Sequence, residues 1–206
     1  MKPLKILIVD DHAIVRMGLA SILETDPEFS VVGEADGGRD ALQKAEELKP
    51  DIVLMDLMMP DMDGAAATAA LHTRFPKLKI LILTTFGTAD GIAHAIKAGA
   101  AGAVMKNIDF KELVAAIRSA AAGKRVLSSE IRRSLEETPP IPELTDRQQQ
   151  ILDSLTRGLT DADIAAELKL SPNGVRDHIT AIYTKLGAAN RAEAVAIALR
   201  KHLLKT

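Results

Sequence analysis

Residues 52–56 read Ile-Val-Leu-Met-Asp, and this short run sets the fold of the first half of the chain. An apolar run of this length, bounded by Pro50 and Pro60, predicts a strand buried on both faces of a parallel sheet. In open α/β sheets, ligands bind at the edge formed by the carboxyl ends of the strands. Asp56 ends the run, so we expect its carboxylate to lie in a site at that edge.

Strands and helices are expected to alternate around this run. This alternation predicts a doubly wound α/β fold, in which five parallel strands are joined by helices through right-handed crossovers. Residues 1–121 would form this first domain. The other four strands are expected at residues 4–9, 30–35, 79–84 and 102–105.

Polar residues follow or end most of these strands. Asp10 and Asp11 follow the first strand, Thr84 ends the fourth, and Lys106 follows the fifth. Because the carboxyl ends of parallel strands meet at one edge, these groups are expected to converge on Asp56. Clustered carboxylates need a cation, and oxygen ligands without Cys or a second His favour Mg²⁺. Asp56 would attack a phosphoryl group, while Mg²⁺ and Lys106 offset charge on its oxygens and Thr84 donates a hydrogen bond to them.

Each acid also has a simpler interpretation. Asp10 and Asp11 are the type of residue that stabilises the start of a helix, and Asp56 alone could be a solvated loop acid. His12 has no second imidazole at ligand spacing, so we expect it to begin the first helix. The convergence of the whole set favours a site over these separate explanations.

The residues around these positions resemble a known family. The similarity is to the receiver domain of bacterial two-component response regulators, a flavodoxin-like fold, and it covers about residues 4–121. It rests on Ile8-Val9-Asp10-Asp11-His12, Val53-Leu54-Met55-Asp56, Pro60-Asp61-Met62-Asp63-Gly64, Leu83-Thr84 and Lys106.

The resemblance implies a role for each residue of the site. Asp56 would accept phosphate from a histidine kinase, and Thr84 and Lys106 would bind the phosphoryl group. Such a protein is no enzyme beyond catalysing its own phosphorylation and dephosphorylation. The Mg²⁺ ligands would be Asp10, Asp11, Asp56 and the backbone carbonyl of Met58.

Two positions depart from the receiver pattern. Ala103 stands where receivers usually carry Tyr or Phe, whose ring moves inward when the threonine at the site moves toward phosphate. Asn107 stands where many receivers have a proline with a cis bond. Both changes leave the phosphorylation chemistry intact and concern the route by which a signal leaves the site.

Residues 122–143 are expected to link this domain to a second one. Pro139, Pro140 and Pro142 cannot continue a helix and favour an extended, stiff connection. A short helix over residues 129–135 is expected inside the linker.

Residues 144–206 carry only helical patterns. Thr145, Thr160 and Ser171 are expected to cap three helices, and a fourth begins near Asn190. The second and third helices, joined by the turn at residues 169–172, form a helix-turn-helix pattern. A plain helical bundle is the alternative on pattern alone.

This region is similar to the LuxR-type helix-turn-helix, over about residues 141–204, which together with a receiver resembles the NarL/FixJ group of transcription factors. The similarity rests on Leu144-Thr145-Asp146-Arg147, Gly158-Leu159-Thr160, Asp163-Ile164-Ala165, Leu170-Ser171, Val175-Arg176-Asp177-His178 and Lys185-Leu186-Gly187. It implies contact with double-stranded promoter DNA. The predicted contacts are Asn173, Arg176, Asp177, Thr180 and Lys185.

Here too the chain departs from its relatives. Gly174 replaces a common threonine and lowers helix propensity by about 0.8–1 kcal/mol relative to alanine. Gln148 replaces an acid that often forms a salt bridge between helices. Asp177 repels phosphates unless it accepts a hydrogen bond from a cytosine amino group.

The charge of this second domain predicts how strongly it binds DNA. Residues 1–121 hold 13 Lys and Arg against 17 Asp and Glu, whereas residues 144–206 hold nine against seven. So small a basic excess predicts weak non-specific binding, so that a homodimer on half-sites about 10 base pairs apart is needed. The predicted dimer surface is Val195, Ala198 and Leu199 on the last helix.

Composition limits the remaining possibilities. The chain has 206 residues, 47% apolar and 26% charged, which is typical of globular proteins. The absence of cysteine excludes disulfides and thiolate metal sites. No apolar stretch approaches the roughly 18 residues of a membrane span. We expect a cytoplasmic protein without a membrane partner.

The leading hypothesis is a DNA-binding response regulator whose phosphorylation on Asp56 controls dimerisation and DNA binding. One alternative is a regulator that works without phosphate, as Ala103 suggests. Another is a protein-interaction regulator whose tail does not bind DNA, as Gly174 and Asp177 suggest. A phosphatase with Asp56 as nucleophile is disfavoured, because no additional general acid or base is evident.

Overall fold

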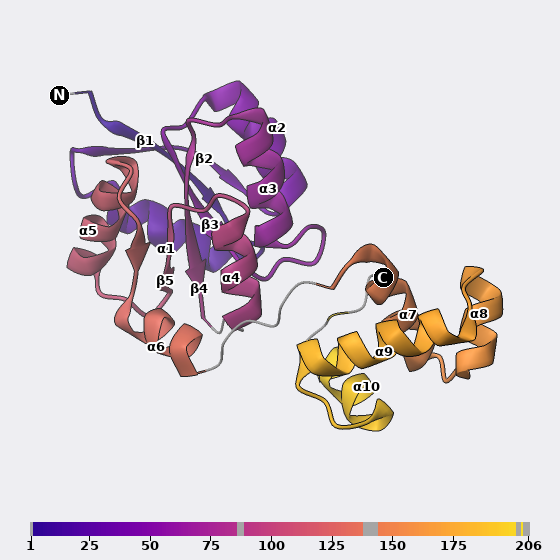
Figure 1. Cartoon of the computed structure of the whole chain (residues 1–206). Helices are drawn as coiled ribbons and strands as arrows, with labels where there is room; N and C mark the ends of the chain where they lie inside the picture. Colours follow the sequence, from indigo (N-terminus) through magenta and orange to yellow (C-terminus); the bar gives the residue numbers. More distant parts are fainter. Residues whose placement is uncertain (1, 86–88, 138–143, 201–202, 204–206) are drawn as a thin grey trace. The chain divides into compact units, whose positions relative to one another are not determined.

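The chain forms two compact units, residues 1–140 and 141–206, in the computed structural model (Figure 1). The structure describes residues 2–85, 89–137, 144–200 and 203. The last six residues of the predicted linker, 138–143, with all three prolines, lie outside the described residues. Among the described helices, none is long and apolar enough to cross a membrane.

The first unit contains a parallel sheet with the strand order β2-β1-β3-β4-β5-β6. All five residues of β3 are buried, as the apolar run predicts, and the doubly wound fold class is confirmed. The sheet has six strands rather than the predicted five. They are β1 (Leu4–Val9), β2 (Phe29–Ala35), β3 (Ile52–Asp56), β4 (Lys79–Thr84), β5 (Gly102–Met105) and β6 (Val126–Leu127).

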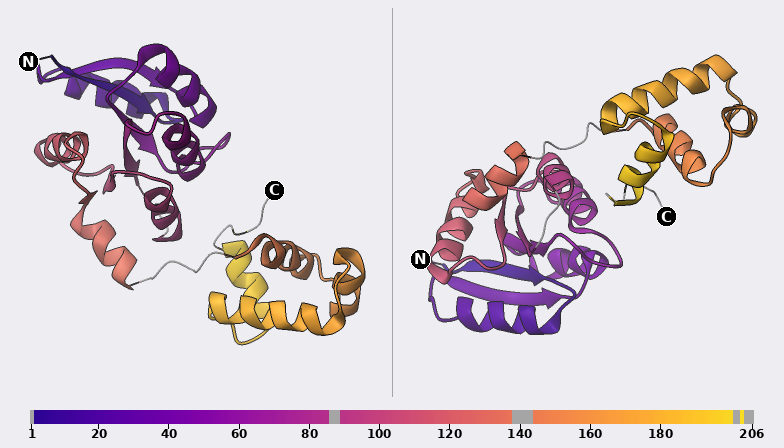
Figure 2. Two further views of the ribbon diagram at one scale, coloured as in Figure 1. Left: turned by 45° about the horizontal axis from the view of Figure 1, so that its top comes forward. Right: turned by 90° about the horizontal axis from the view of Figure 1, so that it is seen from below.

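Helices cover both faces of the sheet (Figure 2). On one face, α1 (Ala13–Leu23) and α5 (Phe110–Ala121) pack over the strands. On the other face lie α2 (Gly38–Leu48), α3 (Gly64–Arg74) and α4 (Ala89–Lys97). The sheet is therefore the middle of three layers, as alternating strands and helices require.

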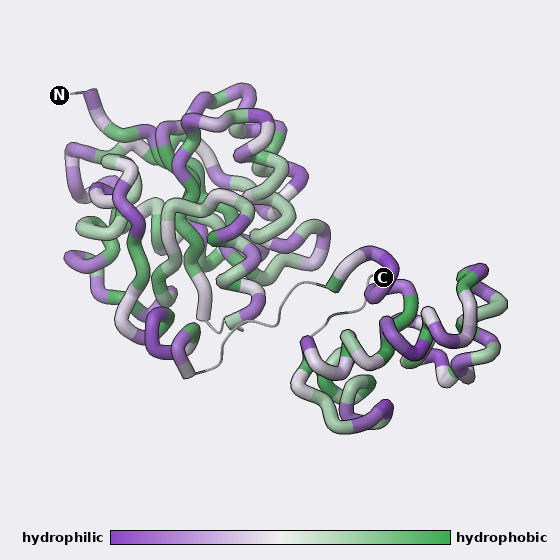
Figure 3. Tube along the Cα trace, in the orientation of Figure 1, coloured by the Kyte–Doolittle hydropathy of each residue, from purple (hydrophilic) through white to green (hydrophobic). Residues whose placement is uncertain are grey.

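Strand β3 shows why no polar residue interrupts the run. Val53 and Met55 belong to the apolar cluster under α2, α3 and α4, whereas Ile52 and Leu54 belong to the cluster under α1 and α5. Successive side chains of a strand point to opposite faces, and here both faces are covered. Hydrophobic segments accordingly run through the middle of the first unit (Figure 3).

Part of the predicted linker belongs to the first unit. Strand β6 pairs with β5, so the prediction that residues 122–143 are a linker without a strand is wrong for Val126 and Leu127. The short helix expected over residues 129–135 is confirmed as α6 (Ser129–Glu137). Ile131 on α6 is 1% exposed and lies in the same apolar cluster as Ala103. The physical reason is that β5 would otherwise be an edge strand with unpaired backbone groups.

The second unit is a four-helix domain with its own apolar core. Thr145, Thr160 and Ser171 cap α7, α8 and α9 through their side-chain oxygens, as predicted. Pro172 occupies the first turn of α9, where its missing N–H costs nothing. The helices are α7 (Asp146–Thr156), α8 (Asp161–Leu168), α9 (Pro172–Leu186) and α10 (Arg191–Arg200).

Candidate functional site

The predicted acidic site forms at the carboxyl edge of the sheet. Asp10 follows β1, whose last residue lies opposite Met55 of β3, so that Asp10 and Asp56 are neighbours. Lys106 follows β5 and brings its amino group between them. Its Nζ lies 2.5 Å from Asp10 Oδ2 and 3.0 Å from Asp56 Oδ1. The strand register thus joins three residues that are nearly 100 positions apart in the sequence.

Burial and charge act against each other at these groups. Asp56 is only 4% exposed, and this burial raises the pKa of its carboxyl group, although Lys106 and the N–H of Leu57 act to lower it. Burial also acts to lower the pKa of Lys106, but its pairs with Asp10 and Asp56 outweigh burial and raise that pKa. The lysine is therefore charged at neutral pH and favours the ionised form of Asp56.

Asp11 lies at the open side of the cluster. Its side chain is 28% exposed, and Oδ1 lies 2.8 Å from Nδ1 of His12. The backbone N–H of His12 donates to Asp10 Oδ1 over 2.9 Å. Helix α1 begins directly after His12, as predicted, and the His12 side chain makes no capping hydrogen bond.

The cluster can supply several ligands to one cation. One ligand atom each from Asp10, Asp11, His12 and Asp56 all lie within 4.8 Å of one another. Three of the four donors are carboxylate oxygens, which suit a hard divalent cation such as Mg²⁺. The acidic pocket therefore fits a metal of this class. Met58 lies two residues after Asp56 with an exposed side chain, and its carbonyl stays a predicted ligand.

Thr84 ends β4 beside these residues, opposite Met105 of β5. Its hydroxyl is buried and, within the described part of the chain, has no hydrogen-bond partner. Buried polar groups are nearly always paired, so an orphan at the edge of a site indicates a missing acceptor. An oxygen atom of a ligand would satisfy it.

Gly64, which begins α3, has a packing role that the sequence did not predict. A Cβ atom at this position would lie 2.2 Å from the backbone oxygen of Asp56. Only glycine allows the start of α3 to approach the end of β3 so closely. The preceding Asp63 caps the helix by accepting a hydrogen bond from the N–H of Ala66 over 2.7 Å.

In the second unit, α8 and α9 form the helix-turn-helix. One side of α9 is buried in the domain core. Four of the predicted DNA contacts are exposed residues of the same helix: Asn173, Arg176, Asp177 and Thr180. The turn before α9 contains Lys169, whose φ of 54° is left-handed. A short helix, a tight turn and a helix with an exposed polar side are the parts that a major-groove reader needs.

Comparison with known proteins agrees with the two sites. Residues 6–118 match the family model of the response regulator receiver domain. Residues 142–198 match that of the bacterial regulatory proteins of the luxR family. The chain belongs to the response regulators. It is a transcriptional regulator with a receiver domain and a LuxR-type helix-turn-helix DNA-binding domain.

Relatives of similar length support this assignment. The transcriptional regulatory protein LiaR of Bacillus subtilis (strain 168) is 38% identical over 98% of this chain and 99% of its own length. The response regulator protein VraR of Staphylococcus aureus is 35% identical over 98% of this chain and 99% of its own length. The response regulator ChrA of a heme-sensing two-component system, known from a crystal structure, is 33% identical in sequence. The match has a TM-score of 0.59 and covers 99% of this chain and 100% of that chain.

A structure of two RcsB dimers bound to two parallel DNAs shares the fold. It is 24% identical to this chain, with a TM-score of 0.68 over 96% of this chain and 98% of that chain.

Ala103, which stands where receivers usually carry an aromatic residue, has apolar neighbours in this response regulator. Ala103 is fully buried, and its register partner in β6 is Leu127. The same apolar cluster contains Ile131 of α6. The regulator thus packs aliphatic side chains from β6 and α6 beside the position where receivers usually carry an aromatic ring. No cis peptide bond occurs in the described ranges, so the bond between Lys106 and Asn107 is trans.

Gln148, which stands in place of the usual acid, keeps a link between helices α7 and α9. Its Oε1 accepts a hydrogen bond from Lys185 Nζ over 2.8 Å and another from the backbone N–H of Thr145 over 3.0 Å. The amide thus joins α7 to α9 where relatives of the regulator often use a salt bridge. Lys185 is partly buried by this contact, in contrast to the exposed side of α9.

The predicted dimer surface on α10 is wrong for one residue. Ala198 is fully buried in the core of the helix-turn-helix domain, because this face of α10 packs on α7 and α9. Val195 is partly buried against the same core. Leu199 is 56% exposed and stays a predicted contact.

Proposed function

We propose that a histidine kinase phosphorylates this response regulator on Asp56, and that phosphorylation promotes dimerisation and binding to promoter DNA. The observation that carries the proposal is the position of Lys106 between Asp10 and Asp56. A buried carboxylate with an ammonium group at 3.0 Å is a nucleophile whose phosphorylated product would have one positive charge beside it.

The residues of the site divide the work of phosphoryl transfer. A carboxylate oxygen of Asp56 attacks phosphorus, and the bond to the kinase histidine breaks. Lys106 and the hydroxyl of Thr84 donate to the phosphoryl oxygens, which gives the orphan hydroxyl its acceptor. Mg²⁺ held by Asp10, Asp11, Asp56 and the Met58 carbonyl would offset negative charge on the phosphoryl group. We propose that the regulator catalyses only its own phosphorylation and dephosphorylation.

The helix-turn-helix would place α9 in the major groove. Arg176 is an exposed donor for bases or phosphates, and Asn173 lies one turn earlier. Thr180 is also exposed, and its hydroxyl donates to the backbone carbonyl of Arg176 over 2.9 Å. Asp177 would accept from a cytosine amino group, because it repels phosphates elsewhere. Lys185 would approach the DNA backbone from its contact with Gln148.

A dimer would place two such helices on neighbouring half-sites. Two RcsB dimers hold DNA in the related fold, and we extend dimeric DNA binding to this chain. The small basic excess of residues 144–206 supports the need for two copies, because one copy neutralises few phosphates. DNA binding under the control of a kinase would place the regulator in the cytoplasm.

The test is DNA binding with and without a phosphodonor. Sites are first selected from random DNA with protein treated with acetyl phosphate and Mg²⁺. Treatment should raise affinity for these sites by at least about tenfold, within the usual range of coupling between two sites. Asp56→Asn should abolish the increase, whereas Asp36→Asn, which changes an exposed acid of the same domain, should keep it. Equal affinity with and without the donor would overturn control by phosphate and leave DNA binding standing.

A second candidate is a regulator that works without phosphate. Ala103 pairs with Leu127 of β6 and shares one apolar cluster with Ile131 of α6, which favours this candidate because the aromatic part of the usual receiver switch is absent. In that case Mg²⁺ with beryllofluoride, a phosphoryl mimic, would leave the oligomeric state unchanged in gel filtration. A shift from monomer to dimer would exclude this candidate.

A further inference from the structure

The receiver has two adjoining hollows at the end of the sheet opposite Asp56. They are formed by the segments that precede β3, β4, β5 and β6. The larger hollow has a volume of about 660 Å³ and the smaller one of about 300 Å³. Both are lined by Pro76 and Leu78, so these two residues form a shared wall. Pockets of roughly 300–1,000 Å³ are the size that takes a small molecule.

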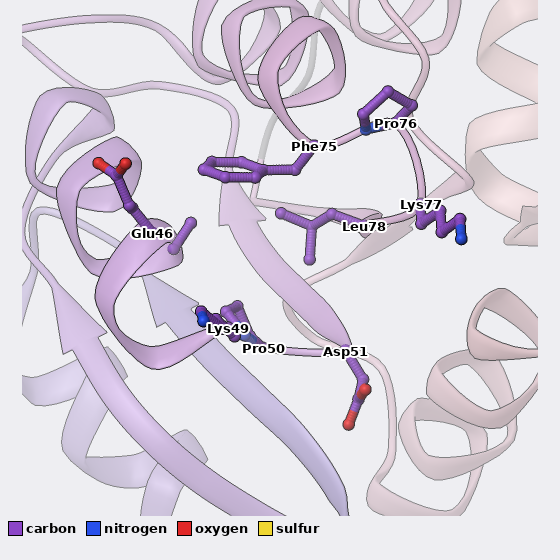
Figure 4. Close-up of a pocket in the computed structure, with 9 residues that line it drawn as sticks. Glu46, Lys49, Pro50, Asp51, Phe75, Pro76, Lys77 and Leu78 are labelled. Carbon is purple, nitrogen blue, oxygen red and sulfur yellow. The ribbon is translucent and has the colours of Figure 1, made fainter.

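The larger hollow has an apolar interior. Phe75 and Leu78 project into the space beside the end of α2, and the carboxylate of Asp51 points away from them (Figure 4). Both acids of its lining are already engaged. Glu46 lies 2.5 Å from Nη2 of Arg74, and Asp51 accepts from the backbone N–H of Lys5 over 2.9 Å. The hollow therefore presents hydrocarbon, together with Lys49 and Lys77 of its lining, and no unsatisfied acid.

The smaller hollow is basic. Its lining contains His72, Lys79, Lys124 and Arg125 and no acidic residue. Within the described part of the chain, none of these four side chains forms an ion pair or a hydrogen bond. The His72 ring is held against the backbone of Gly99, where a Cβ atom would lie 2.7 Å from its Cγ.

We propose that these two hollows together bind an amphiphilic anion, with its apolar tail against Phe75 and Leu78 and a phosphate-class head group among Lys79, Lys124 and Arg125. An apolar chamber that adjoins a basic one through a shared wall matches a ligand with two unlike ends. Burial of the tail supplies affinity, and cations without acidic neighbours select the charge. This site goes beyond phosphorylation and DNA binding, and it lies at the far edge of the sheet from both Asp56 and its partners.

Isothermal titration calorimetry on the full chain tests the proposal. The probes are decyl phosphate below its micelle concentration, methyl phosphate and the uncharged decyl maltoside. Decyl phosphate should bind one to one, and each methylene that enters the apolar hollow should strengthen binding by about fourfold. K124A/R125A should weaken it by about tenfold. The matched control R39A/K111A removes one exposed arginine and one exposed lysine elsewhere in the receiver and should change nothing. Asp56→Asn should also keep full affinity, which separates this site from the phosphoacceptor.

Several results would overturn the proposal. Equal affinity for methyl and decyl phosphate would remove the role of the apolar hollow. Equal affinity of decyl maltoside, or no loss in K124A/R125A, would remove the role of the basic one. Tighter binding of a polyglutamate peptide than of decyl phosphate would assign the surface to an acidic protein segment instead. No saturable heat with any probe would mean that the basic residues only balance the nearby ends of α3, α4 and α5.

Discussion

Replacing Lys106 by methionine should destabilise the receiver strongly. The substitution keeps most of the apolar stem and removes the ammonium group that lies between Asp10 and Asp56. Two buried carboxylates would then face each other without a cation. The proposed chemistry of the site thus makes a prediction about stability that needs no kinase and no DNA.

The structure sets the size of the effect. At an effective dielectric constant of about 20, ion pairs at 2.5 and 3.0 Å are each worth roughly 5–7 kcal/mol of Coulomb attraction. The cost of burying Lys106, which is 12% exposed, offsets much of this attraction. Removing one partner of a buried pair costs about 3–5 kcal/mol, and we expect about 3 kcal/mol because the cluster opens to solvent at Asp11.

Urea unfolding separates the two domains of the chain. The sequence has no tryptophan and one tyrosine, Tyr183, which lies in α9. Tyrosine fluorescence therefore follows the helix-turn-helix domain, whereas circular dichroism follows both. Lys106→Met should lower the midpoint of the receiver transition by about 2 M urea, for a slope of roughly 1.5 kcal/mol/M, and leave the tyrosine transition in place. Lys44→Met, which breaks a more exposed ion pair with Asp40, should cost about 0.5 kcal/mol.

The loss of stability in Lys106→Met should depend on pH and on Mg²⁺. Because the folded-state pKa of Lys106 is raised, its stabilisation is complete below the unfolded value of about 10.4 and is lost as pH rises through the folded value. Burial raises the pKa of Asp56, so its protonated form stabilises the folded variant, and the deficit should shrink as pH falls from 7 toward about 4. Mg²⁺ should also reduce the deficit. Equal midpoints for the variant and the original protein from pH 5 to 8 would refute the reasoning.

Three further predictions concern β5 and the helix-turn-helix. Ala103→Tyr should destabilise the receiver by about 1–3 kcal/mol, because Ala103 is fully buried in one cluster with Ile131; an unchanged urea midpoint would contradict this. Arg176→Ala should weaken DNA binding and, if the side chain meets phosphate, reduce the slope of log affinity against log salt by about one, measured by fluorescence anisotropy. Gln148→Glu should raise the free energy of unfolding of the helix-turn-helix domain, followed by tyrosine fluorescence, by about 0.5 kcal/mol, because a carboxylate would face Lys185. Adding Lys185→Met should cancel that gain.

Strand β3, three helix caps and the convergence of the acidic site could be predicted from local sequence. Strand β3 is one continuous apolar run because both faces of the sheet are covered, and such a run has few other interpretations. The caps Thr145, Thr160 and Ser171 were predictable because capping needs only a side-chain oxygen and the N–H groups of the next turn. The convergence of Asp10, Asp56 and Lys106 followed from strand ends alone.

Other features depend on contacts between distant segments. Residues 126–127 are too few for a strand pattern, and only the open edge of β5 makes them one. Ala198 has an apolar neighbour on the same helix in Leu199, yet one is in the core and the other faces solvent, because α7 and α9 pack on a single side of α10. The sequence by itself determined the five longer strands, the helices and the polar groups that end or follow those strands, since these depend on neighbours along the chain. Tertiary structure decided the sixth strand, the orphan hydroxyl of Thr84 and the two adjoining hollows, because each is made by residues that meet only after the chain has folded.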